Sequence, residues 1–231
     1  MNITPTLLYK NLSTFFGKQK WWPVDDKYHN RYHTDPRSEI IIGTILTQNT
    51  AWKNVEKVLN NLKKTQNLSI NPIANMSDDE LKKLIKSSGY YNQKTDRLKH
   101  LMTYFMEDYN SDLSQFFSLQ KDEARKKLLS IKGIGPETAD SILLYAGNYQ
   151  IFVVDTYTKR ISKRLPILIK NDSYNEIQQV FETDLAGSYP EENICLIYQQ
   201  LHAMIVELAK NFCKVKPECK NCPIQNICSF H

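Results

Sequence analysis

Apolar residues recur along most of the chain at the intervals of amphipathic helices. In residues 38–62 the spacings are mostly three and four, and the polar run LTQNT interrupts the pattern near its middle. This segment therefore predicts two helices joined by a polar corner. A second long stripe, residues 174–212, breaks near Gly187 and Pro190, and the one strand-like run is residues 151–154. Taken together, the pattern predicts an all-α protein.

Local signals mark further helix ends. Ser77, followed three residues later by Glu80, is typical of a capping box at the start of a helix, and Gly89 is suited to end that helix. We find no internal repeat and no low-complexity linker, so composition alone marks no domain boundary.

A glycine turn separates two helical patterns in the run IKGIGPETADSILLYAG, residues 131–147. Gly133 and Gly135 come just before Pro136, which suits the first turn of a helix because its missing N–H is not needed there. With the helical segment DEARKKLLS in front, this predicts helix, glycine turn, helix. Such a turn lets the backbone approach a phosphate, and the helix start can donate N–H groups to it. A tight helical connection that binds nothing fits the same residues.

Asp155 follows an apolar run and precedes a basic helical stretch in FVVDTYTKRISKRL. Its simplest role is to cap the helix by accepting free backbone N–H groups. A carboxylate at a helix start is also kept ionised by the helix dipole, as the stabilisation of a developing cation requires. The residues alone leave both roles open.

Four of the five cysteines fall within the last 19 residues, in the spacing C-x5-C-x2-C-x5-C: Cys213, Cys219, Cys222 and Cys228. This clustering is unlike a secreted disulfide framework and indicates metal ligands in a reducing compartment. Zinc sites more often use two separated close pairs, whereas four thiolates in one loop also suit a 4Fe-4S cluster. We favour the cluster over zinc, and either over unligated thiols. Cys195, in an apolar helical context, is interpreted as a buried small hydrophobe.

Composition and charge narrow the classes of protein that remain. Hydrophobic residues make up 41% and charged residues 24%, which excludes wholesale disorder. Thirty basic and 25 acidic residues give a formal charge of +5, which permits a polyanionic partner without demanding one. No stretch approaches the roughly 20 apolar residues that cross a bilayer, and the start MNITPTLLYKNL lacks a signal-peptide pattern. We expect a cytoplasmic protein with no membrane partner.

Several of these motifs occur together in one known family. KGIGPETA, then VDT some twenty residues later, with LTQNT and SGYYNQK before them, resembles the endonuclease III superfamily of helix-hairpin-helix DNA glycosylases. The resemblance covers residues 38–228 and implies that Asp155 is catalytic and that Gln48 enters the gap in the duplex. The hairpin residues that it implies for DNA binding are Lys132, Gly133, Gly135 and Thr138.

The resemblance also implies an architecture and partners. It predicts a six-helix lobe at residues 35–147 containing the hairpin, and a second lobe of residues 1–34 plus 148–231 with Asp155 and the cysteines, with a catalytic groove between them. We expect the partner to be double-stranded DNA with a damaged base, and the protein to act as a monomer. In endonuclease III the first cysteine gap has six residues where this chain has five, so the cluster pattern is close but not identical.

One departure from the family changes the expected chemistry. Bifunctional members place a lysine two residues after the second hairpin glycine, and this chain has Glu137 there. Without that amine, covalent catalysis and strand cleavage lose their nucleophile. We therefore predict a monofunctional glycosylase that leaves an abasic site. For Glu137 itself we favour the role of a solvated first-turn acid.

An aromatic block, Trp21, Trp22 and Pro23, precedes LTQNT, and Trp52 follows it. Adjacent tryptophans can simply anchor a terminal segment, but they can also wall a pocket in which stacking returns about 1 to 3 kcal/mol for a flipped base. A cationic base gains further from cation–π attraction. With GIGPE and LHAMIVELAK, the block resembles the 3-methyladenine glycosylase branch, whose members generally lack the cluster.

We therefore expect an alkylated purine such as 3-methyladenine as the substrate. The alternatives are a glycosylase for mismatched or oxidised bases, and a noncatalytic DNA-binding or redox-sensing protein built on the same hairpin.

Overall fold

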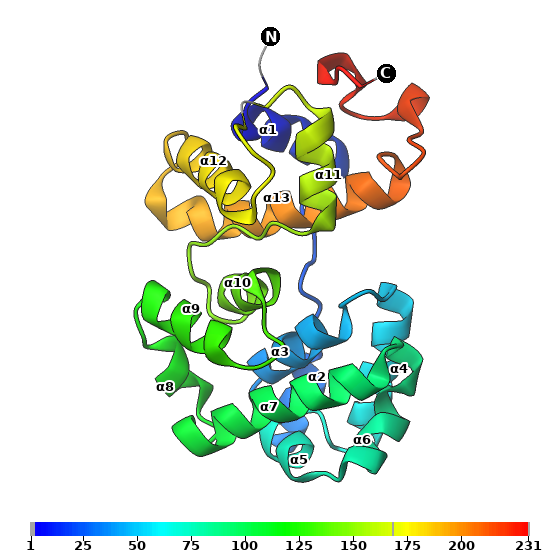
Figure 1. Cartoon of the computed structure of the whole chain (residues 1–231), viewed down its shortest axis with the longest axis vertical. Helices are drawn as coiled ribbons and strands as arrows, with labels where there is room; N and C mark the ends of the chain where they lie inside the picture. Colours follow the sequence, from blue (N-terminus) through cyan, green and yellow to red (C-terminus); the bar gives the residue numbers. More distant parts are fainter. Residues whose placement is uncertain (1–2, 168, 231) are drawn as a thin grey trace. The chain divides into compact units, whose positions relative to one another are not determined.

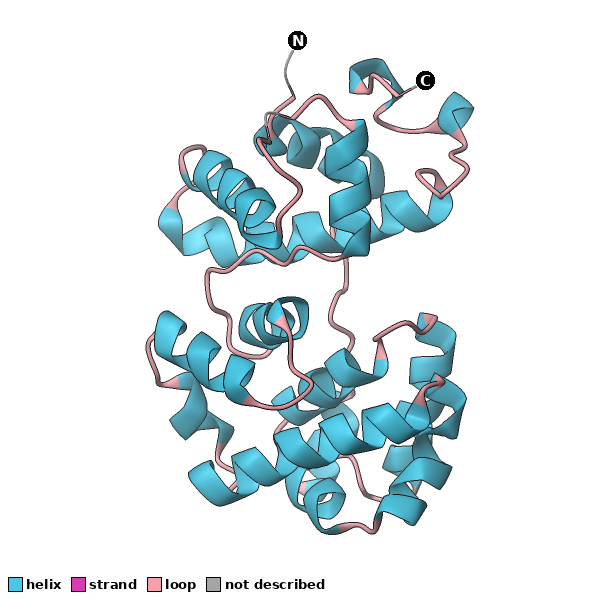
Figure 2. Ribbon diagram, viewed as in Figure 1, coloured by secondary structure: helices cyan, strands magenta, loops and turns pink. Residues whose placement is uncertain are grey.

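The computed structural model describes residues 3–167 and 169–230, and every regular element in these residues is helical (Figures 1 and 2). The all-α prediction is therefore confirmed. The chain divides into two compact units, one formed by Met1–Trp21 with Asn148–His231 and the other by Trp22–Gly147. No helix in the described part of the chain is both long and apolar enough to cross a membrane.

The unit Trp22–Gly147 contains nine α-helices and one 3₁₀ helix: α2 (Asp26–Tyr32), α3 (Arg37–Leu46), α4 (Trp52–Lys64), α5 (Ile70–Asn75), α6 (Asp78–Ile85), η1 (Lys86–Ser88), α7 (Tyr91–Tyr109), α8 (Leu113–Phe117), α9 (Lys121–Ser130) and α10 (Pro136–Tyr145). The longest, α7, packs against α3, α5, α6 and α8, and α10 packs against α3 and α9 (Figure 1). Leu98, Leu101, Met102 and Phe105 form the fully buried stripe that α7 places in this core. Residues 35–147 hold eight of these α-helices rather than the expected six, because α5 and α8 form short helices of their own.

The sequence signals for helix ends in this unit are confirmed. The polar corner lies between α3 and α4, and Ser77 and Glu80 form the capping box at the start of α6. Gly89 has a φ of 66° and follows η1, and Pro136 is in the first turn of α10. Most of these signals work within one turn of helix, so they do not depend on distant packing.

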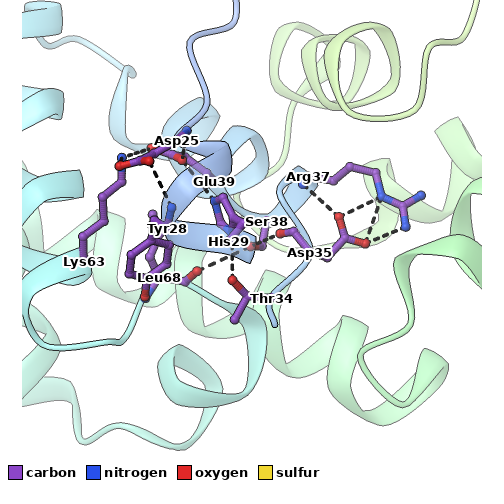
Figure 3. A network of polar contacts seen from close by, with 10 residues as sticks. All are labelled: Asp25, Tyr28, His29, Thr34, Asp35, Arg37, Ser38, Glu39, Lys63 and Leu68. Carbon is purple, nitrogen blue, oxygen red and sulfur yellow. Dashed lines mark hydrogen bonds and ion pairs between the residues drawn. The ribbon is translucent and has the colours of Figure 1, made fainter. Parts of the chain in front are cut away.

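A buried polar network explains why this unit begins earlier than the expected residue 35 (Figure 3). Glu39 of α3 accepts the backbone N–H of Asp25 at 3.0 Å, contacts His29 Nε2 of α2 at 3.1 Å and pairs with Lys63 of α4 at 2.8 Å. Burial alone would raise the pKa of Glu39, but these three partners outweigh it and hold the pKa below its usual value. The network therefore ties the segment before α3 to α3 and α4.

The other unit contains four α-helices in its described residues, α1 (Pro5–Phe16), α11 (Thr156–Arg164), α12 (Tyr174–Ala186) and α13 (Glu191–Asn211), and the 3₁₀ helices η2 (Cys219–Asn221) and η3 (Gln225–Ile227). The long helix α13 packs against α1, α11 and α12. The predicted break between α12 and α13 is confirmed.

Residues 151–154 are buried but form no strand, so the strand-like interpretation was wrong. Side chains of α12 take the place of a partner strand. Phe152 N–H donates to the Glu182 carboxylate at 2.7 Å, and the Gln178 amide donates to Phe152 O at 2.7 Å. The backbone groups of Phe152 are thus satisfied without a sheet, and the segment leads directly to Asp155 at the start of α11.

Candidate active site and nucleic-acid interface

Asp155 is the N-cap of α11, as the sequence predicted. Its Oδ1 accepts the backbone N–H of Thr158 at 2.6 Å, and its side chain is buried. The second oxygen, Oδ2, lies 3.7 Å from Nε2 of His202 on α13. The carboxylate therefore sits between a helix start, which favours negative charge, and an imidazole.

The surroundings of Asp155 favour its ionised form. Burial alone would raise its pKa, but His202 and then the Thr158 N–H oppose this, so the pKa is held below its ordinary value. At neutral pH the group is an anion, as stabilisation of a developing positive charge requires. Sequence reasoning did not single out His202, which lies in the apolar stripe of LHAMIVELAK. The signal that the sequence offered was a histidine within an otherwise apolar helical stripe.

The four clustered cysteines line one cavity, which they share with hydrophobic residues including Phe212 and Ile224. None of the four forms a disulfide. Burial raises the pKa of the Cys222 thiol, and the sulfurs of the other three raise it further. Four thiols along one cavity are the donor types of an iron–sulfur cluster. Among the described residues, no three His, Cys, Asp or Glu side chains are grouped closely enough to hold a metal ion.

Cys195 lies outside this cavity, half-buried on α13. Burial raises the pKa of its thiol to about 11. It is therefore a protonated thiol at neutral pH, with little nucleophilic character.

Two arginines join α11 to the cysteine loop. Arg160 Nε donates to Cys213 O at 2.9 Å, and Arg164 Nη1 donates to Cys213 Sγ at 3.2 Å and to Lys214 O at 2.6 Å. The helix that Asp155 caps therefore holds the loop through its C-terminal half. Neither arginine was singled out from the sequence, where both belong to an ordinary basic helical stretch.

The hairpin turn before α10 presents its backbone at the surface. Lys132, Gly133 and Gly135 are exposed. Gly133 has a φ of 92°, and a Cβ built there would lie 2.6 Å from Cγ of Arg97 on α7. A Cβ on Gly135 would meet nothing within 4 Å. Gly133 is thus required by the fold, whereas Gly135 leaves open space where a phosphate could approach the backbone.

The structure brings the expected DNA-contacting side chains together within this unit. The Gln48 amide donates to Thr138 Oγ1 of α10 at 2.9 Å and accepts a hydrogen bond from Arg97 Nη1. Because Arg97 also packs on Gly133, four residues from three sequence segments form one cluster. We call Gln48, Arg97, Gly133 and Thr138 the hairpin cluster. Arg97 was not anticipated, and its one signal was a cation shortly after the SGYYNQK motif.

The aromatic block is split by the division into units, which falls between Trp21 and Trp22. Within the unit Trp22–Gly147, the Trp22 ring contacts Trp52 at 5.8 Å and Tyr145 at 5.7 Å between centroids, both edge to face. A Cβ on Gly43 of α3 would lie 2.8 Å from the Trp22 ring, so this glycine lets the indole lie against the helix. The sequence pointed to Trp22 and Trp52 but not to Tyr145.

Pro23 and Trp52 also line a surface hollow of about 720 Å³ beside the network of Figure 3. Its titratable lining is mostly acidic: Asp25, Asp26, Glu39 and Glu56 against Lys27 and Lys63. An excess of carboxylates does not suit a phosphate, so this hollow is not a DNA-backbone site.

Comparison with known proteins settles the family. Residues 42–185 match the model of the HhH-GPD superfamily base excision DNA repair proteins. The chain belongs to this superfamily. It is 43% identical over 223 residues to a Methanocaldococcus jannaschii protein whose name gives it, provisionally, as a DNA repair glycosylase, with 96% of this chain and 94% of the relative covered. It is 28% identical to endonuclease III of Thermotoga maritima, over 87% of this chain and 86% of the relative.

A solved structure of this superfamily has a similar fold. The H. pylori 3-methyladenine DNA glycosylase, bound to 1,N6-ethenoadenine, matches with a TM-score of 0.70 and 28% identity, over 90% of this chain and 98% of that one. The resemblance of the motifs to the endonuclease III superfamily is thereby confirmed. As an HhH-GPD protein the chain is a base excision repair DNA glycosylase, an enzyme that acts on DNA.

Proposed function

We propose that this enzyme is a monofunctional DNA glycosylase that hydrolyses the N-glycosidic bond of an alkylated purine, such as 3-methyladenine, in duplex DNA. We include in the proposal that it acts as a monomer in the cytoplasm. The observation that carries it is the ionised, buried Asp155 at the start of α11, in a chain with Glu137 where bifunctional relatives place an amine.

In this proposal Asp155 acts as a fixed anion beside the sugar of an everted nucleotide. Cleavage of the glycosidic bond develops positive charge on the sugar, and a preorganised carboxylate stabilises that charge. The Thr158 N–H and His202 hold its two oxygens. An N3-alkylated purine already carries positive charge, so it leaves without protonation by an enzyme acid and the site needs no such group.

The hairpin cluster is the proposed contact with DNA. The exposed backbone at Gly133 and Gly135 receives a phosphate, with Lys132 beside it, which fixes position rather than sequence. Gln48 leaves its bonds to Thr138 and Arg97 and fills the space left by the everted base. Trp22, Trp52 and Tyr145 supply rings for a base that has lost its stacking. The likeness to the H. pylori enzyme supports this choice of substrate class.

A panel of duplexes that each contain one lesion tests the substrate. Release of 3-methyladenine under single-turnover conditions is the expected result. Release of only uracil, thymine or adenine would contradict the alkylated-purine assignment while leaving the enzyme a glycosylase. No base release from any duplex, with DNA binding intact, would contradict the catalytic assignment itself.

Borohydride trapping tests the absence of a covalent step. We expect no stable protein–DNA adduct from the wild-type protein on a duplex with an abasic site, because Glu137 cannot form a Schiff base. Glu137→Lys restores an amine at this exposed position and should produce a trapped adduct, which serves as the positive control. An adduct with wild-type protein would contradict the monofunctional assignment.

We also propose that Cys213, Cys219, Cys222 and Cys228 hold a 4Fe-4S cluster, supported by their shared cavity. Bound there, the cluster would stabilise the C-terminal loop. A broad visible absorption band in anaerobically purified protein is the expected result, and it should be lost in Cys222→Ala and kept in the matched Cys195→Ala. Zinc without iron in the purified protein would contradict the cluster.

A further inference from the structure

Lys94 of α7 is a buried cation that neither the fold nor the proposed chemistry explains. Its residue is 1% exposed. Its Nζ donates to Leu46 O at 2.9 Å, to Thr50 Oγ1 at 2.9 Å and to Ser88 O at 2.8 Å. All three ammonium donors are therefore used.

The partners of Lys94 are oxygens of neutral groups. Leu46 is the last residue of α3 and Ser88 the last residue of η1, so two helix ends direct their partial negative charge at one cation. Thr50 in turn donates its hydroxyl to Ser88 O. Among the described residues Lys94 has no ion pair with a carboxylate. Burial and, as a smaller cause, the facing charge of Arg97 together lower its pKa to about 8. Keeping this charge buried therefore costs desolvation free energy, which an apolar side chain at the same position would not require.

The position of these contacts ties Lys94 to Gln48. Leu46, just before the polar corner, and Thr50, within it, lie on either side of Gln48, so Lys94 holds the corner at two points. The side chain of Gln48 is held by Thr138 and Arg97, bonds that it gives up when it enters a duplex. Its position on DNA then depends on the backbone of the corner alone.

We propose that Lys94 is a positioning residue that holds the polar corner of residues 47–51 in the shape that places Gln48 in the DNA gap. This rests on the role of Gln48 in the proposed function. Lys99, on the same helix, offers a matched control. Its Nζ donates to Ala74 O at 2.5 Å and Met76 O at 2.6 Å, at the end of α5, and so closes a helix end that carries none of the candidate site residues.

The experiment measures the dissociation constant for a duplex with a tetrahydrofuran abasic analogue, which needs no base release. The variants are Lys94→Met, Gln48→Ala, the double variant and Lys99→Met, each checked for folding by circular dichroism. We expect Lys94→Met and Gln48→Ala each to weaken binding by about tenfold or more, since small misplacement of such a group has large effects. The double variant should bind no more weakly than the worse single variant, and Lys99→Met should stay within about twofold of wild type.

The outcomes separate the two proposals. If Gln48→Ala weakens binding and Lys94→Met does not, the Lys94 inference is wrong and the role of Gln48 stands. If Gln48→Ala has no effect, both fail. Additive losses in the double variant, or a loss in Lys99→Met equal to that in Lys94→Met, would show that Lys94 supports only the fold.

The pH dependence of duplex affinity tests the role of Lys94 even if Lys94→Met does not fold. The wild-type affinity should fall as the pH rises through about 8, where Lys94 loses its charge and one of its three donors. Gln48→Ala should lack this step, because its corner no longer carries the amide. A wild-type profile that is flat between pH 7 and 9.5, or a step of equal size in Gln48→Ala, would overturn the inference.

Discussion

Replacing either hairpin glycine with alanine adds one methyl group. From the structure we predict different losses in the free energy of unfolding at the two positions. Gly133 has a φ of 92°, which costs an L-residue about 1 to 2 kcal/mol. Its new Cβ would lie 2.6 Å from Arg97 Cγ. Arg97 is flexible and can move, but it then loses its hydrogen bond to Gln48, worth about 0.5 to 1.5 kcal/mol. Gly133→Ala should therefore destabilise the fold by about 1.5 to 3.5 kcal/mol.

Gly135→Ala is the matched substitution. Its backbone is extended, with φ −98° and ψ 177°, and a Cβ there meets nothing within 4 Å. We expect its free energy of unfolding to stay within about 0.5 kcal/mol of wild type. The methyl group does occupy the space proposed for a phosphate, so duplex binding should weaken while stability is kept. Gly133→Ala should lose both stability and duplex binding.

Urea unfolding followed by circular dichroism measures the first effect, and a titration with tetrahydrofuran duplex measures the second. A Gly133→Ala protein as stable as wild type would refute the argument from φ and from the Arg97 contact. Wild-type duplex affinity in Gly135→Ala would refute the argument that a phosphate approaches this backbone.

Three further predictions concern other charged groups. Because the pKa of Asp155 is lowered in the fold, its ionisation stabilises the protein above about pH 4 and this contribution is lost as the pH falls through the folded value. A carboxyl-carbon NMR titration should give a midpoint below about 3.9, and a higher midpoint would contradict the assignment. Arg125→Ala leaves the fully buried Asp140 without its 2.7 Å partner and should cost about 3 to 5 kcal/mol in urea unfolding, whereas Lys127→Ala, at an exposed pair, should cost under about 1 kcal/mol. Arg164→Met removes a donor to the cysteine loop and should speed proteolysis of that loop at unchanged helix content; unchanged cleavage would show that the contact does not hold it.

Much of the fold is encoded in short-range patterns. The capping box at Ser77, the proline of α10 and the N-cap at Asp155 were predictable, because each works within one turn of helix. The strand-like interpretation of residues 151–154 was wrong, because side chains of α12, more than twenty residues away, bond the backbone of Phe152 in place of a partner strand. The early start of the unit Trp22–Gly147 likewise depends on the distant pair of Glu39 and Lys63.

The residues of the candidate site also fall into two groups, those that the sequence indicates and those whose roles only the fold reveals. Asp155, Gln48, the hairpin glycines and the cysteines were singled out from their motifs. The contacts of His202, Arg97 and Tyr145 with these residues become visible only in the fold. The same holds for the contacts of Lys94, although this lysine ends the motif SGYYNQK. The buried position of Lys94 could also be inferred from the sequence. It continues the stripe of Leu98, Leu101 and Phe105 by one helical step, which places a lysine on a buried face.

Asp155→Asn tests the central claim most directly, because asparagine caps a helix as well as aspartate does and can keep the bond to Thr158. The fold should therefore survive while the negative charge is lost. We predict that single-turnover release of 3-methyladenine falls by about a hundredfold to a thousandfold, with the dissociation constant for a tetrahydrofuran duplex within a few-fold of wild type. Base release at the wild-type rate in a folded Asp155→Asn protein would contradict the account.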